Sequence, residues 1–360
     1  MLSETRVRCP GELVEDSYLA QLGQADEVWS RLSRGMPAGA LGHLPECVFL
    51  MLKPDALVSG RYESLLSGMA EAGWQLLHAQ ATLTASERHF EELYQYNLTI
   101  RNEQNMMCAW WINKRLYAMG PSVALMVRVP PHADGLTAHQ QVKRLKGPSN
   151  PFKGSPGELR WDAGGTNLAL NLLHSADDPI SSAREFLIFH TEDQLLRALG
   201  RAAALAGAPP GGAADAALPD AVLREQLFLA GAGTRRLDLP SVLTLVKSRL
   251  RATGPDEEYR SATRSLYARY LALVSSPPDI RTRWTRFGEL CAEERAVLDR
   301  LDRGRAGGDR ELLRRLATPS AFDFSTADDI RVELSRRKIA CDPWDELALD
   351  TSLYYSQLLP

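Results

Sequence analysis

The stretch that decides the fold is NLLHSADDPISSARE, residues 171–185. It places His174 directly after an apolar pair and just before Asp178-Pro179, a helix N-cap followed by proline at the first helical position. A carboxylate, Glu185, follows eleven residues after the histidine. A nucleophilic imidazole must present one nitrogen while a partner fixes the other, so this spacing predicts a positioned, reactive histidine.

Three further motifs lie upstream of this stretch. Lys53-Pro-Asp-Ala closes an apolar run, Gly147-Pro-Ser-Asn-Pro is a turn, and Pro156-Gly-Glu-Leu-Arg160 is a second turn that ends in a cation. Phosphoryl transfer depends mainly on positioning and on cations around the phosphates, which Lys53 and Arg160 supply here. In this order and at these spacings, the four motifs resemble the nucleoside diphosphate kinase family.

The resemblance implies a role for each residue that matches a family motif. It implies that His174 carries a phosphoryl group, that Glu185 holds the ring, and that Tyr94 lies beside it. Contacts to nucleotide and phosphate are implied for Lys53, Lys143 or Arg144, Ser149, Arg160 and Asn171. The resemblance also implies Mg²⁺ carried by ATP or another NTP, no metal ligand from the protein, an NDP acceptor and ping-pong kinetics.

Two departures from the family pattern concern the charged site. The family's His-Gly-Ser-Asp is His-Ser-Ala-Asp here, and Ala176 lacks the hydroxyl that helps to hold the glutamate. We therefore expect Glu185 to be less firmly fixed. Lys143 stands where the family has its first phosphate-binding arginine, and a lysine offers a point charge instead of a bidentate fork.

The segment that binds the base differs most. Residues 97–119 are longer than their family counterpart, and the phenylalanine that stacks on the base has no clear equivalent. Trp110, Trp111 and Tyr117 are alternatives for stacking, although aromatic residues at such positions more often belong to a core.

Apolar patterning predicts an α+β fold: a ferredoxin-like βαββαβ domain, with a four-stranded antiparallel sheet and helices on one face. The expected strands are 47–52, 74–83, 122–129 and 186–190. The expected helices are 62–72, 86–96 and 138–145.

Four regions are expected along the chain. Residues 1–46 form a leader with an amphipathic helix over 16–32, and residues 47–198 form the kinase-like domain. Residues 199–219 are rich in Ala, Gly and Pro and read as a linker. Residues 220–360 show apolar residues at three- and four-residue spacing, which predicts a mainly α-helical domain, and no catalytic motif.

Composition excludes several classes of protein. With 360 residues the chain is long enough for two domains. Its net charge of −3 gives no electrostatic reason to expect nucleic acid or an anionic membrane as a partner. Its five cysteines are scattered without a CxxC pair, so neither a zinc site nor a disulfide framework is indicated. No signal peptide or membrane-spanning run is evident, so we expect a cytoplasmic protein.

Three functions remain open at this point. The first is an NTP:NDP phosphotransferase that works through His174. The second is a related phosphotransferase with another acceptor, such as a protein histidine or a metabolite. The third is a non-catalytic, nucleotide-binding interaction module. The added helical domain leaves open whether the chain forms a homo-oligomer and whether that domain binds a protein partner.

Overall fold

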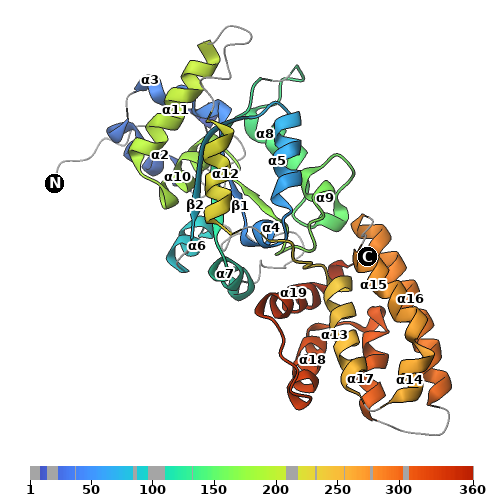
Figure 1. Cartoon of the computed structure of the whole chain (residues 1–360). Helices are drawn as coiled ribbons and strands as arrows, with labels where there is room; N and C mark the ends of the chain where they lie inside the picture. The colour runs from blue at the N-terminus through green and yellow to red at the C-terminus, as the bar shows by residue number, and fades with distance from the viewer. Residues whose placement is uncertain are drawn as a thin grey trace. The chain divides into compact units, whose positions relative to one another are not determined.

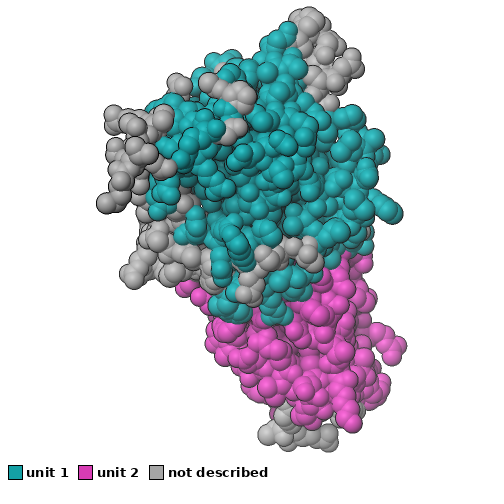
Figure 2. Space-filling model, turned by 90° about the vertical axis from the view of Figure 1, so that its left-hand side faces the viewer, with its two compact units in different colours: residues 1–147, 157–163, 172–234 teal, residues 148–156, 164–171, 235–360 magenta. Residues whose placement is uncertain are grey.

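A computed structural model describes most of the chain. The described residues are 9–13, 23–36, 38–83, 87–95, 110–131, 133–207, 218–231, 233–254, 256–275, 279–302 and 308–359. The chain forms two compact units, coloured separately in Figure 2. The first comprises 1–147, 157–163 and 172–234, and the second comprises 148–156, 164–171 and 235–360. Within the described ranges, no helix has the length and apolarity needed to cross a membrane.

The first unit is built on a four-stranded antiparallel sheet (Figure 1). Its strands are β1 (Cys47–Leu52), β2 (Gln75–Thr82), β3 (Ser122–Arg128) and β4 (Leu173–Ser175), in the spatial order β2-β3-β1-β4. Helix α5 (Tyr62–Glu71) lies between β1 and β2 in the chain, and α8 (Ala138–Lys146) lies between β3 and β4. This is the βαββαβ order of a ferredoxin-like domain, so the predicted α+β fold is confirmed.

Both faces of the sheet are covered, whereas the sequence predicted helices on one face. Side chains alternate along a strand, and β1 is buried at every position. Phe49 and Met51 join a core with helices α2 (Ala25–Gly35), α10 (Pro179–Phe189) and α11 (Glu192–Gly207). Val48, Leu50 and Leu52 join a second core with α5, α8 and α12 (Asp220–Leu229). Each such side chain stabilises the fold by about 1.5–3 kcal/mol, which explains the unbroken apolar run.

The predicted strand 186–190 is wrong, because these residues close helix α10, which ends at Phe189. Asp178 caps this helix by accepting a hydrogen bond from the Ser181 backbone N–H at 2.8 Å, and Pro179 begins it. Ile180, Ala183 and Phe186 are buried at helical spacing. A short apolar run fits a buried strand or a buried helix equally well. The last strand is instead β4, which contains the histidine.

The first unit also extends further along the chain than expected. Helix α11 continues through residues 199–207, where a linker was predicted, and residues 208–217 lie outside the described ranges. Helix α12 packs along the edge strand β2, where Gln226 Oε1 accepts a hydrogen bond from the Ala81 backbone N–H at 2.9 Å. The predicted leader helix begins at Ala25 within the described ranges, and its earlier residues 16–22 lie outside them.

The described part of the second unit is mainly helical, as predicted. Its α-helices are α13 (Leu239–Thr253), α14 (Glu257–Ala262), α15 (Arg264–Ser275), α16 (Ile280–Leu301), α17 (Gly308–Leu316), α18 (Phe324–Arg336) and α19 (Pro343–Tyr354). Aspartates begin several of them. Asp279 caps α16 by accepting from the backbone N–H groups of Arg281 and Thr282, both at 3.0 Å.

Candidate active site

His174 lies in the middle of β4, where it pairs with Met51 of β1. Its side chain is 14% exposed, and its Nε2 lies 2.7 Å from Oε2 of Glu185 on α10. An ionised carboxylate can only accept hydrogen bonds, so Nε2 carries the ring proton and donates a hydrogen bond to Glu185. The lone pair is then on Nδ1, which makes Nδ1 the nucleophilic nitrogen.

A neighbouring arginine holds the glutamate. Arg184 Nη2 lies 3.3 Å from the second carboxylate oxygen of Glu185, Oε1. The same guanidinium donates to the backbone carbonyl of Glu92 at 2.8 Å, on helix α6 (Glu87–Tyr94). The sequence predicted a loosely held Glu185 because of Ala176. The structure instead shows both carboxylate oxygens engaged, one by His174 and one by Arg184.

The Lys-Pro-Asp-Ala motif supports the strand that carries the histidine. Leu172, two residues before His174, has a φ of 72°, a left-handed conformation that costs about 1–2 kcal/mol for an L-residue. Its N–H donates to Asp55 Oδ2 and its carbonyl accepts from the Lys53 N–H, both at 2.9 Å. These two bonds hold the strained residue in place and thereby set the path of β4.

Two buried cations of the first unit lie at this strand. Lys53 is 2% exposed at the end of β1, and Arg160 is 5% exposed on the short helix α9 (Leu159–Asp162). Arg160 donates to the Leu173 carbonyl at 2.5 Å and to the Gly147 carbonyl at 3.2 Å. Burial lowers the pKa of Arg160 to about 10, so the guanidinium stays charged near neutral pH. Both residues were predicted phosphate contacts.

Tyr94 forms one side of the imidazole environment. Its ring centroid lies 5.4 Å from that of His174, and its hydroxyl lies 2.9 Å from the hydroxyl of Tyr117 on α7 (Trp110–Ala118). Tyr117 is 2% exposed, so in this structure it belongs to the core and does not offer a free stacking surface. Trp111 is 46% exposed. The side chain of Trp110 and residues 96–109 lie outside the described part of the chain.

The remaining predicted residues belong to α8 and to the second unit. Lys143 and Arg144 are exposed on α8, and Arg144 forms an ion pair with Asp134 at 2.8 Å. Ser149 and Asn171 belong to the second unit, where the Asn171 side-chain amide donates to the Ser149 carbonyl at 3.1 Å. The structure therefore brings His174, Glu185, Lys53, Arg160 and Tyr94 together in the first unit, and Ser149 and Asn171 together in the second.

Sequence reasoning missed one cation, Lys146. It lies in the last turn of α8, and its ammonium donates to the hydroxyl of Ser175, the residue after His174. Burial, followed by the charge of Arg160, lowers the pKa of Lys146 to about 7. The signal was the helical period: Lys146 stands four residues after the buried Val142, on the inward face, whereas Lys143 and Arg144 do not.

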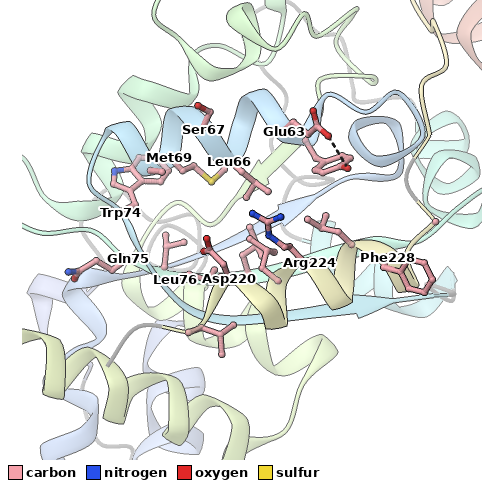
Figure 3. Close-up of a pocket in the computed structure, with 18 residues that line it drawn as sticks. Glu63, Leu66, Ser67, Met69, Trp74, Gln75, Leu76, Asp220, Arg224 and Phe228 are labelled. Carbon is pink, nitrogen blue, oxygen red and sulfur yellow. Dashed lines mark hydrogen bonds between the residues drawn. The ribbon is translucent and has the colours of Figure 1, made fainter. Parts of the chain in front are cut away.

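A cavity of about 1150 Å³ opens elsewhere in the first unit, between α5 and α12 (Figure 3). Its walls are largely apolar, with Leu66 and Met69 on one side and Leu76 on the other. None of the candidate catalytic residues lines it. Across the described ranges, His, Cys, Asp and Glu side chains form no group of three or more that could hold a metal ion.

Comparisons with known proteins find relatives of one family. A sequence model described as "Nucleoside diphosphate kinase" matches residues 46–195. The nucleoside diphosphate kinase of Streptomyces coelicolor is 30% identical over 141 residues, which are 39% of this chain and 92% of that protein. The enzyme of Archaeoglobus fulgidus is 26% identical over 154 residues, 42% of this chain and 90% of the relative.

Solved structures with the same description also match. One is the enzyme of Borrelia burgdorferi, a transition state mimic with bound vanadate and ADP, at 18% identity and a TM-score of 0.35. The match covers 41% of this chain and 88% of that one. Another is the enzyme of Halobacterium salinarum in complex with CDP, at 23% identity and a TM-score of 0.32, covering 42% and 90% of the two chains. From its sequence matches and its motifs, the chain belongs to the nucleoside diphosphate kinase family.

Proposed function

We propose that this chain transfers the γ-phosphoryl group of an NTP, ordinarily ATP, to an NDP through a phosphohistidine on His174. The observation that carries the proposal is the 2.7 Å bond between His174 Nε2 and Glu185, on an imidazole that remains partly exposed. This bond selects the tautomer with its lone pair on Nδ1. Family membership and the retained Lys53 and Arg160 support the same reaction.

The transfer proceeds in two halves. Nδ1 of His174 attacks the γ-phosphorus, an N–P bond forms, and the P–O bond to the β-phosphate breaks with its electron pair leaving on the NDP. The ring retains its Nε2 proton and becomes positively charged, and Glu185 stabilises that charge through the existing hydrogen bond. In the second half, a terminal phosphate oxygen of another NDP attacks the phosphorus and a P–O bond forms. The N–P bond breaks, and its electron pair returns to Nδ1, which restores the neutral imidazole.

Charge neutralisation divides between the protein and the metal. Lys53 and Arg160 supply cations for the phosphate oxygens, and neither side chain can ligate a metal. The carboxylates of Asp55 and Glu185 already bond Leu172 and His174. This donor set fits Mg²⁺ that would be held by nucleotide phosphates and water and would neutralise charge on the phosphates.

The test is labelling of the purified full-length chain with γ-³²P-ATP and Mg²⁺, beside His174→Ala. A matched control is His43→Ala, because His43 also bonds a glutamate, Glu46, at 3.0 Å. We expect acid-labile label on the wild type and on His43→Ala, none on His174→Ala, and transfer of the label to added NDPs.

The other outcomes separate the alternatives. Label that stays on His174 after NDPs are added would show that the acceptor is not an NDP, and would favour a phosphotransferase with another acceptor. No label on a wild type that still binds nucleotide would overturn the transferase and favour a nucleotide-binding interaction module. Label that persists in His174→Ala would exclude His174 as the carrier.

A further inference from the structure

Residues 235–360 of the second unit lie outside the residues that the family model matches and outside the four motifs. We propose that helices α16 and α19 are a built-in positioning device for the nucleotide-binding segments 148–156 and 164–171. This inference rests on the proposed function, in which Ser149 and Asn171 contact the nucleotide. Both segments belong to the second compact unit together with the helices, so every contact described below lies within that unit.

The first link runs from α19 to Asn167. The Asn167 side-chain amide donates to Thr351 Oγ1 and to Ser352 Oγ, both at 3.0 Å. Its carbonyl oxygen accepts from the backbone N–H groups of Ala169 at 2.9 Å and Leu170 at 2.8 Å. Asn167, Thr351 and Ser352 are each at most 2% exposed. A buried amide that satisfies four hydrogen bonds fixes both its own loop and the helix that holds it.

The second link joins that loop to the predicted nucleotide contacts. Asn171 follows the turn held by Asn167, and its side-chain amide donates to the Leu168 carbonyl at 2.9 Å and the Ser149 carbonyl at 3.1 Å. Hydrogen bonds therefore connect α19 to Asn167 and Asn171 to Ser149, and the short turn of residues 168–170, bonded to both asparagines, joins the two. The two residues that the family resemblance assigns to the nucleotide are the last in these contacts.

The third link comes from the first turn of α16. The Arg281 guanidinium donates to the Phe152 carbonyl at 2.7 and 3.1 Å and to the Gly154 carbonyl at 2.9 Å. The Phe152 ring also packs edge-on against Trp284 of the same helix, with ring centroids 6.4 Å apart. The segment that begins at Ser149 is thus held at both ends, by Asn171 and by α16.

The physical consequence concerns affinity more than chemistry. A ligand that must order its own binding loop loses affinity, and contacts that order the loop beforehand restore it. Arg281 and Asn167 would not touch the nucleotide and are positioning residues. Loosening them should raise the dissociation constant for a nucleotide and leave the reactivity of His174 largely intact.

The experiment compares Arg281→Met with Arg269→Met in the full-length protein. Arg281 is exposed, so its loss should not unfold the helical unit, and Arg269 is an exposed arginine that pairs with Glu293 away from the two segments. We expect Arg281→Met to weaken binding of ADP with Mg²⁺, measured by calorimetry, about tenfold. Arg281→Lys should recover part of the loss, because a lysine ammonium can still donate to the Phe152 carbonyl.

Two further measurements keep the outcomes distinct. In Arg281→Met, amide hydrogen exchange should accelerate in residues 150–154 and not in α13, and the maximal rate of His174 labelling should change less than about threefold. Equal ADP affinity and equal exchange in the two methionine variants would overturn the positioning role. Loss of labelling in the wild type with the affinity difference intact would overturn only the transferase, and a wild type that binds no ADP would overturn both.

Discussion

Two buried glutamates, one in each unit, have opposite surroundings. Glu294 on α16 is fully buried, and its two oxygens accept hydrogen bonds from Tyr259 at 2.5 Å, Tyr267 at 3.0 Å and Tyr270 at 2.9 Å, with a further ion pair to Lys247. Glu185 on α10 has two partners, His174 and Arg184, and the imidazole it holds is partly exposed.

The difference distinguishes a structural network from the candidate active site. Around Glu294 every partner is buried, and burial, with the adjacent carboxylate charge, raises the pKa of each tyrosine so that all three remain proton donors. Both oxygens of Glu294 have hydrogen-bond partners, and no atom of this network is left to react with a ligand. The pair at Glu185 instead leaves the lone pair of His174 Nδ1 available, with cations gathered at the same strand. A buried carboxylate is thus a candidate for catalysis when its partner still has a reactive atom to offer.

The largest expected effect is on the stability of the helical unit, and it comes from the network around Glu294. Glu294→Ala leaves the Lys247 ammonium buried without its counter-charge, which should lower the local free energy of unfolding by about 3–5 kcal/mol. Amide hydrogen exchange of α16 measures this directly. The matched control is the neighbouring Glu293→Ala, an exposed carboxylate on the same helix, which should leave exchange unchanged. Equal exchange in the two variants would refute the structural role of Glu294.

The next effect is on the rate at which His174 is labelled, and it comes from the pair of His174 and Glu185. Glu185→Gln keeps a hydrogen-bond acceptor for His174 Nε2 and removes the charge that stabilises the phosphorylated ring. We expect labelling of His174 by γ-³²P-ATP to slow about 100-fold, with the thermal midpoint nearly unchanged. Glu46→Gln, at the other His–Glu pair, is the control. A rate equal to that of the wild type would show that the carboxylate does not act on His174.

A smaller effect is expected one residue away. Arg184→Met removes the donor to Glu185 Oε1 and the bond to the Glu92 carbonyl, so the carboxylate gains freedom to turn from His174. Labelling should slow about tenfold, the equivalent of one well-placed hydrogen bond. Arg184→Lys should be intermediate. A loss as great as that in Glu185→Gln would mean that Arg184 acts on the phosphoryl group itself.

A separate effect is a pH dependence of stability from Lys146. Its pKa is about 7 in the folded chain, below the 10.5 that is usual for a lysine. Between these values the unfolded chain binds a proton that the folded chain lacks, so the contribution of Lys146 to stability rises with pH. Urea unfolding from pH 7 to 10 should show this rise in the wild type and less of it in Lys146→Met. Parallel curves would contradict the assignment.

Local sequence patterns were enough to predict most of the first unit. The apolar run of β1, the Asp-Pro start of α10 and the glutamate eleven residues after His174 are all local signals. The sequence alone therefore predicted the strand, the cap and the contact between His174 and Glu185. The run 186–190 failed because a buried strand and a buried helix share that pattern. Lys146 was missed although the period of α8 points it inward.

Long-range partners were beyond the reach of such patterns. Arg184 reaches back 92 residues to the Glu92 carbonyl, and Asn167 reaches forward 184 residues to Thr351. Neither pairing has a local signature, because polar contacts between distant segments depend on the folded chain. The strained φ of Leu172 was equally hidden, because leucine rarely adopts it. Its bonds to Asp55 and to the Lys53 N–H show why it does here.

The central claim is that Glu185 fixes the His174 ring so that Nδ1 takes the phosphoryl group. The most direct measurement is ¹H–³¹P correlation NMR of the chain after incubation with ATP and Mg²⁺, which distinguishes the two phosphorylated nitrogens. We predict phosphorus on Nδ1 of His174 and its loss after an NDP is added. Phosphorus on Nε2, or on any other side chain, would contradict the account.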